Sequence, residues 1–242
     1  MQYCMTRALG TMNKIANNLQ SVYRRIDTAC QIAGRKRDEV QLLAVSKTRS
    51  SDEVLQAYEF GCRAFGENYL QDALDKITTI QQPDIDWHFI GHLQSNKSKT
   101  VAQHFHWLHT VDRFKIAQRL DSQRPPHMPA LNVCLQVNIS DEASKAGIHS
   151  DELLPLAERV NALENITLRG LMVIPAASDK PVVQRQAFAR SAALFDTLKQ
   201  HYPTVDTLSM GMSADLDSAI LEGSTMVRIG TDIFGPRNTP TQ

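Results

Sequence analysis

The sequence lacks the features that mark membrane-spanning and disulfide-rich proteins. No apolar run approaches the roughly 20 residues that a transmembrane helix needs, and residues 1–10 lack the apolar centre of a signal peptide. Only 4 of the 242 residues are cysteines. They are widely spaced and form no C-x-x-C pair, so neither a disulfide framework nor a zinc site is indicated. We therefore expect a cytoplasmic protein with reduced thiols and no membrane contact.

Charge of either sign is not in excess. The chain has 26 basic and 26 acidic residues, a net charge of zero. A nucleic-acid-binding protein usually carries a basic surplus, so the balance argues against such a partner. A site for one small anion remains compatible with it, because a few donors suffice. No acidic cluster indicates a metal, and no Pro-, Gly- or Ser-rich linker divides the chain.

The chain does contain an alternation of strand-like and helix-like segments. Apolar runs of strand length precede stretches with apolar residues at helical spacing. About eight such units in a chain of this length predict one α/β domain, a (β/α)₈ barrel, with a doubly wound open sheet as the alternative. We predict strands at 41–45, 63–65, 86–90, 107–111, 131–138, 167–174, 205–210 and 225–229, and intervening helices at 51–60, 69–81, 95–105, 112–122, 150–163, 182–200 and 214–222. Ser50 with Glu53 has the spacing of a capping box for the helix at 51–60, and Asp112 is the expected cap of the helix at 112–122.

Both ends of the chain lie outside this alternation. An extra amphipathic helix precedes the first strand, and its clean helical pattern opens at Met12. We expect residues 1–11 to be a disordered N-terminal extension. Residues 12–237 should form the barrel domain, and residues 238–242 a short tail.

Lys47 ends the first apolar run of the chain, LLAVSK, just after the first predicted strand. Functional groups in a barrel of this kind lie at the C-terminal ends of the strands. A partly desolvated lysine amine loses its proton more readily, and a neutral amine can attack an aldehyde to form a Schiff base. A lone lysine at a strand end is more typically a solvated surface group. The case for Lys47 therefore depends on the residues that share its end of the barrel.

The last two predicted strands are followed by residues suited to a phosphate, which often binds at this place in such barrels. After the seventh strand, Gly211 permits a tight turn, and Ser213 can either cap the next helix or donate its hydroxyl to an anion. After the eighth, Gly230 lets the backbone approach a ligand, and Thr231 supplies an amide and a hydroxyl. Each loop alone is typical of an ordinary turn. Two adjacent loops of this kind predict a phosphate-binding site.

Three further polar residues are candidates. Arg228 lies between the apolar Val227 and Ile229, so alternation along the strand turns it toward the barrel interior. There its guanidinium needs a partner, either an acidic side chain or a ligand. Asn68 follows the second strand, where it can cap a helix or reach the barrel mouth. His88 lies within an apolar strand, which is more typical of a hydrogen-bonded core residue than of a catalytic base.

Several segments, in order along the chain, resemble the pyridoxal phosphate homeostasis protein family. The resemblance extends from about Met12 to Arg237 and implies a barrel like the N-terminal domain of alanine racemase. The segments that carry it are 43–48 (LAVSKT), 65–69 (FGENY), 87–91 (WHFIG), 208–213 (LSMGMS) and 226–231 (MVRIGT).

The resemblance implies a cofactor, pyridoxal 5′-phosphate (PLP), held by Lys47 as an internal aldimine. It further implies phosphate binding by Ser213, Gly230 and Thr231, with Arg228 facing the pyridine nitrogen and Asn68 near the ring. The function it implies is PLP (vitamin B6) and amino-acid homeostasis by binding PLP and buffering or delivering it, with no established reaction. PLP-requiring apo-enzymes would then be transient partners. We expect a monomer, because the racemase partner surface belongs to a second domain absent here.

Two alternatives remain open, a racemase-like PLP enzyme and a barrel that holds another phosphorylated metabolite. Arg228 opposite a pyridine nitrogen would favour the unprotonated ring, a weaker electron sink. Alanine racemase uses the same arrangement, so this residue does not exclude catalysis. The resemblance to alanine racemase lacks the second domain, which supplies a tyrosine acid/base there. This difference favours binding over catalysis.

Overall fold

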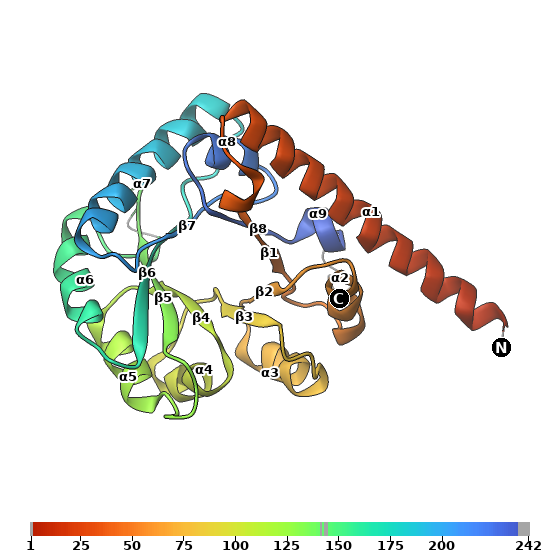
Figure 1. Ribbon diagram of the computed structural model, residues 1–242, viewed down its shortest axis with the longest axis horizontal. Coiled ribbons are helices and arrows are strands. Elements are labelled where there is room, and N and C mark those ends of the chain that lie inside the picture. The colour runs from red at the N-terminus through yellow and green to blue at the C-terminus, as the bar shows by residue number, and fades with distance from the viewer. Residues whose placement is uncertain (1, 141, 143–144, 237–242) are drawn as a thin grey trace.

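A computed structural model describes residues 2–140, 142 and 145–236, with side chains described from Lys14 onward. All its strands are parallel neighbours in sequence order and close into one barrel (Figure 1). The predicted (β/α)₈ barrel is thus confirmed, and the open-sheet alternative is wrong. The strands are β1 Gln41–Val45, β2 Ala64–Glu67, β3 Asp86–Phe89, β4 Trp107–Val111, β5 Leu131–Val137, β6 Ile166–Val173, β7 Thr207–Ser209 and β8 Met226–Ile229.

Helices follow the strands and lie outside the ring that the strands form (Figure 1). The last strand is also followed by a helix, α9, which the sequence pattern did not predict because a single turn shows no helical period. The α-helices are α1 Gln2–Ile32, α2 Ser51–Glu59, α3 Leu70–Thr79, α4 Ser98–His104, α5 Phe114–Gln123, α6 Leu153–Asn161, α7 Pro181–His201, α8 Leu216–Leu221 and α9 Thr231–Phe234; short 3₁₀ helices are η1 Arg37–Glu39, η2 Ser95–Lys97 and η3 Ser150–Glu152.

The apolar core has two parts, one on each side of the strands. The larger part lies between strands and helices and includes the outward-facing Val227 and Ile229. The interior of the barrel holds two small apolar clusters, one of which is Trp107, Cys134 and Met172. The interior also holds several buried polar side chains, His88, His109, Ser209 and Arg228. A polar interior of this kind indicates a site built into the barrel rather than packing alone.

The extra N-terminal helix α1 packs against α2, α8 and α9. Its apolar face, which includes Leu19, Val22 and Ile26, is buried as the pattern predicted. The helix begins at Gln2, and its N-terminal end projects past the barrel (Figure 1). Disorder of residues 1–11 stays a prediction, and the tail 238–242 lies outside the described residues.

Of the two helix caps predicted from the sequence, one is present in the structure and one is not. Ser50 forms the predicted capping box with Glu53 at the start of α2. Asp112 does not cap α5, because Arg113 occupies the cap position and instead donates to the Asp112 carboxylate. Of the helices in the described residues, none has the length and apolar character needed to cross a membrane. Nor do these residues form a group of three or more His, Cys, Asp or Glu side chains able to hold a metal ion.

Candidate functional site

A cavity of about 290 Å³ lies at the C-terminal ends of the barrel strands. Every predicted site residue lines it, although these residues lie far apart in the sequence, from Lys47 to Thr231. An apolar wall accompanies the polar groups. The predicted lining residues are Lys47, Asn68, Ser213, Arg228, Gly230 and Thr231, and the others are Val45, Ile90, Met172, Ile174, Met212 and Ala214.

The turn that carries Lys47 is held by helix α3. Lys47 is half-buried and separated from the end of β1 only by Ser46, and the next residue, Thr48, has φ of 62°. A positive φ is uncommon for a residue with a side chain and requires local support. The Asp72 carboxylate supplies it by accepting a hydrogen bond of 2.9 Å from the Thr48 amide. The direction in which the chain leaves Lys47 is thus set by a residue of α3.

A buried ion pair reinforces the same turn. Lys76 is 2% exposed and donates to the carbonyl of Ser46 at 2.7 Å and to Glu67 Oε1 at 2.8 Å. It also donates to Asp72 at 2.9 Å, and the Ser46 hydroxyl donates to Glu67 at 2.6 Å. Burial raises the pKa of the Glu67 carboxyl, and Lys76 opposes that rise. The network ties the residue before Lys47 to α3 and to the end of β2.

Asn68 presents an unpartnered acceptor at the cavity. Its Oδ1 atom is buried and has no hydrogen-bond partner among the described residues. Buried polar atoms are nearly always hydrogen-bonded, so such an atom in a cavity lining indicates a place for a ligand donor. The backbone of Asn68 passes close to Gly91, where a Cβ atom would lie 2.2 Å from the backbone carbonyl oxygen of Asn68. Only glycine at position 91 allows β3 to end this close to Asn68.

Arg228 lies in the barrel interior, as the alternation of β8 predicted, and is 5% exposed. Its Nη1 donates to the carbonyl and hydroxyl of Ser209 at 2.7 and 2.8 Å, and its Nη2 donates to the Val173 carbonyl at 2.9 Å. No ion pair joins it to an acidic residue in the described part of the chain. Burial lowers the pKa of Arg228 to about 10, which still leaves the guanidinium charged at neutral pH. The site therefore contains an orientated cation.

Two neutral histidines continue the hydrogen-bond chain from Arg228 and Ser209 into the barrel interior. His109 Nδ1 lies 3.1 Å from the Ser209 hydroxyl, and His109 Nε2 lies 2.9 Å from His88 Nδ1. Burial, with a contribution from the Arg228 charge, lowers the pKa of His109 to about 3, and burial holds the pKa of His88 well below its usual value. Neither lines the cavity. His88 is thus a hydrogen-bonded core residue, as its sequence context indicated.

The β7–α8 loop has a conformation that requires glycine. Gly211 has φ of 92°, and a Cβ atom there would lie 2.5 Å from the Cβ of Ala219 in α8. The cap position of α8 is Asp215, which accepts from the Met212 amide at 2.6 Å. The interpretation of Ser213 as a helix cap is therefore wrong. Its hydroxyl is left available to the cavity that Ser213 lines.

The β8–α9 loop offers backbone amides beside this first loop. Gly230 is the cap residue of α9, and Thr231 is its first residue. The first amides of a helix have no partner within it, which favours an anion at that end. A Cβ atom on Gly230 would approach the Val45 carbonyl to 3.2 Å. Strands β7 and β8 are paired, so the two loops lie side by side as predicted.

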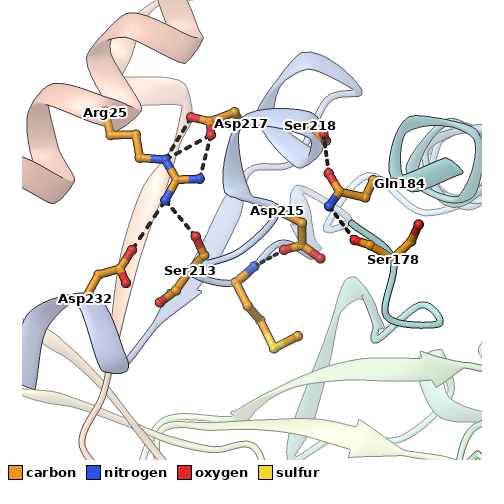
Figure 2. A network of polar contacts seen from close by, with 9 residues as sticks. Arg25, Ser178, Gln184, Ser213, Asp215, Asp217, Ser218 and Asp232 are labelled. Carbon is orange, nitrogen blue, oxygen red and sulfur yellow. Dashed lines mark hydrogen bonds and ion pairs between the residues drawn. The ribbon is translucent and has the colours of Figure 1, made fainter. Parts of the chain in front are cut away.

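Some residues that shape the site had no clear signal in the sequence. Met172 and Ile174 at the end of β6 could have been found from their strand-end position, but Arg25 and Lys76 read as ordinary helix surface residues. Figure 2 shows Arg25 between Asp217, Ser213 and Asp232, all close to the β7–α8 and β8–α9 loops.

Comparison with known proteins agrees with the observed fold and with the family resemblance of the sequence segments. Residues 17–238 match the family described as alanine racemase, N-terminal domain. The chain is 51% identical over 230 residues to the pyridoxal phosphate homeostasis protein of Escherichia coli (strain K12), covering 94% of this chain and 98% of that protein.

Solved structures agree. PipY of Synechococcus elongatus PCC7942, with PLP bound, has a TM-score of 0.78 at 34% identity and covers 92% of this chain and 100% of its own. Alanine racemase of Clostridium difficile 630 has a TM-score of 0.72 at 12% identity over 94% of this chain and 61% of its own, which shows a shared fold alone. The chain belongs to the pyridoxal phosphate homeostasis protein family, whose barrel is that of the alanine racemase N-terminal domain.

Proposed function

We propose that this protein binds PLP in the cavity at the barrel mouth and acts in intracellular PLP and amino-acid homeostasis, by holding the cofactor and passing it on. The observation that carries the proposal is the convergence of an amine, an arginine and two anion-suited loops on one cavity. The name of the Escherichia coli relative and the PLP bound to PipY support it.

The lining residues suit the chemical parts of PLP. The cofactor has a phosphate, a flat ring with a pyridine nitrogen, a ring hydroxyl and an aldehyde. The cavity offers amides and hydroxyls of two loops, an apolar wall and a half-buried amine. The unpartnered Oδ1 of Asn68 is an acceptor for a hydroxyl group. Each part of the cofactor therefore has a matching group in the cavity.

The residues then have distinct roles. When bound, PLP supplies an aldehyde that condenses reversibly with an amine and releases water. Lys47 provides that amine, and the network of Lys76 holds its turn in place. Ser213, Gly230 and Thr231 hold the phosphate. Arg228 is a charged donor without acceptor capacity, so it keeps a facing pyridine nitrogen unprotonated.

Binding is favoured over catalysis by what surrounds Lys47. The described residues that line the cavity include no histidine, tyrosine, aspartate or glutamate. A racemase needs an acid/base group on each side of the reacting carbon, and only Lys47 is suited to one such role. Tyr69, which follows Asn68, is 54% exposed and does not line the cavity. The arrangement therefore favours a carrier of PLP.

Exposed apolar side chains at the cavity mouth suit the release of PLP to a recipient protein. Ile174 and Met212 line the cavity and remain 41% and 39% exposed. Transient contact with PLP-requiring apo-enzymes would cover these apolar side chains while the cofactor transfers. We include in the proposal a cytoplasmic location and a monomeric state.

The decisive experiment compares the wild-type protein with Lys47→Ala after incubation with PLP. We expect an absorption band at about 420 nm for the wild type and none for the variant, because only the lysine amine forms the absorbing bond. Lys115→Ala, which removes an exposed lysine of α5, is the control and should keep the band.

Borohydride reduction followed by peptide mass analysis locates the attachment. A PLP adduct on Lys47 is the expected result. A band that persists in Lys47→Ala, or an adduct on another lysine, would contradict the assignment. The complete absence of an adduct from the wild type would favour a barrel that binds another phosphorylated metabolite.

A further inference from the structure

Arg25 joins the two loops of the candidate phosphate site although it does not line the cavity. It belongs to α1, the helix that precedes the barrel. Its Nε donates to both oxygens of Asp217 in α8, at 3.1 and 2.9 Å. Its Nη1 donates to the Ser213 carbonyl at 2.6 Å and to Asp232 at 3.3 Å (Figure 2). One nitrogen therefore links the β7–α8 loop to the first turn of α9, next to Gly230 and Thr231.

The bond to the Ser213 carbonyl orients the peptide group that follows it. In a trans peptide the N–H points away from the preceding C=O, and the structure has no cis peptide among its described residues. Because that carbonyl points at Arg25, the amide of Ala214 points away from Arg25. Ala214 is one of the residues that line the cavity. Arg25 thus determines how a backbone donor is presented at the site.

Arg25 also offsets two negative charges beside the loops. Asp217 and Asp232 would each repel a phosphate bound nearby, and the guanidinium lies against both carboxylates. The Arg25 side chain is 34% exposed, and ion pairs this accessible contribute little to folding stability. Its contribution should therefore appear in the binding of an anion more than in the stability of the barrel.

We propose that Arg25 is a positioning residue for the phosphate of the ligand, acting through the Ser213–Ala214 peptide and the spacing of the two loops. The inference rests on the proposed PLP-binding function and deepens it. It assigns the extra N-terminal helix a part in ligand binding, specifically at the end of the site that holds the anion.

The test measures dissociation constants for PLP and for pyridoxal, which has the same aldehyde and ring but no phosphate. We expect Arg25→Ala to weaken PLP binding about five- to tenfold, the loss of roughly one charged hydrogen bond. Pyridoxal affinity should change less than about twofold, because the contact acts at the phosphate. Arg25→Lys, which keeps the charge and a donor, should restore part of the PLP affinity.

Arg24→Ala is the matched control, since Arg24 is the adjacent, exposed arginine of the same helix. Circular dichroism of the ligand-free variants checks folding, and Arg25→Gln replaces Arg25→Ala with the same expectation if the alanine variant is misfolded. Equal losses for PLP and pyridoxal, or PLP binding as tight as in Arg24→Ala, would overturn the inference alone. Failure of the wild type to bind PLP would instead overturn the proposed function, and this inference with it.

Discussion

At the scale of single residues, Lys76 lies where its charged amine loses contact with water, which costs solvation free energy. Its amine is almost fully buried between Glu67 and Asp72, and it also holds the Ser46 carbonyl beside Lys47. A buried charge is tolerated when it is paired, and removing one partner leaves the other uncompensated. The Glu67 carboxylate, whose second oxygen already has no partner among the described residues, would be that uncompensated group.

We therefore expect Lys76→Met to lower the free energy of unfolding by about 3–5 kcal/mol, measured by urea denaturation. PLP binding should weaken as well, because the turn before Lys47 loses its anchor. The double variant Glu67→Gln/Lys76→Met should recover part of the stability, since it removes both charges. Lys115→Met is the exposed control, and a Lys76→Met protein as stable as that control would show that the buried pair contributes nothing.

At the scale of elements, the β7–α8 loop depends on how closely α8 packs against it. Gly211 and Gly223 both have positive φ, of 92° and 95°. A Cβ atom on Gly211 would collide with Ala219 at 2.5 Å, whereas on Gly223 the nearest atom lies at 4.0 Å. Both glycines thus need a left-handed backbone, but only Gly211 lacks room for a Cβ atom. Substitution of each by alanine therefore separates the cost of the backbone conformation from the cost of the collision with α8.

Substitution of either glycine by alanine should lower the free energy of unfolding by about 1–2 kcal/mol, from the left-handed backbone. Only Gly211→Ala should displace α8 and the Ser213 loop, which adds to that loss and weakens PLP binding several-fold. Urea denaturation and PLP titration of both variants give the comparison. Equal PLP affinities in the two variants would mean that the packing of α8 does not shape the loop.

At the scale of the whole molecule, the polar chain in the barrel interior makes stability depend on pH. His88 and His109 have pKa values lowered by burial in the folded state, to about 3 for His109. In the unfolded chain each returns to about 6.5. Below that pH the unfolded state binds more protons, so acid favours unfolding. Glu67, whose pKa is raised by burial, acts in the opposite direction and offsets part of the effect.

The free energy of unfolding should therefore fall between pH 7 and pH 5, by about 2 kcal/mol from His109 alone. Urea denaturation at the two pH values measures the change. His109→Gln keeps a hydrogen-bonding side chain beside Ser209 and should remove that part of the pH dependence. An unchanged pH dependence in this variant would show that His109 does not titrate on unfolding.

Some residues of the candidate site could be predicted from the sequence, and others could not. Lys47, Asn68 and Arg228, which line the cavity, could be predicted to lie at the barrel mouth because each stands out against an apolar strand or follows one closely. The start of α5 was misjudged at Asp112, because the backbone is still extended at Arg113, which is the cap residue, and the helix begins at Phe114. Arg25 had no signal, since on its own helix it is one of two adjacent arginines.

Hydrophobic periodicity is a local property of the chain, so it was enough to predict the order of strands and helices and the strand ends at which the candidate site lies. Which distant groups meet depends on the fold as a whole. Arg25 and Asp217 are 192 positions apart, and no local pattern encodes their contact. Closure of the barrel brings α1 against α8 and α9, and that contact places an arginine without any sequence signal beside the proposed phosphate site.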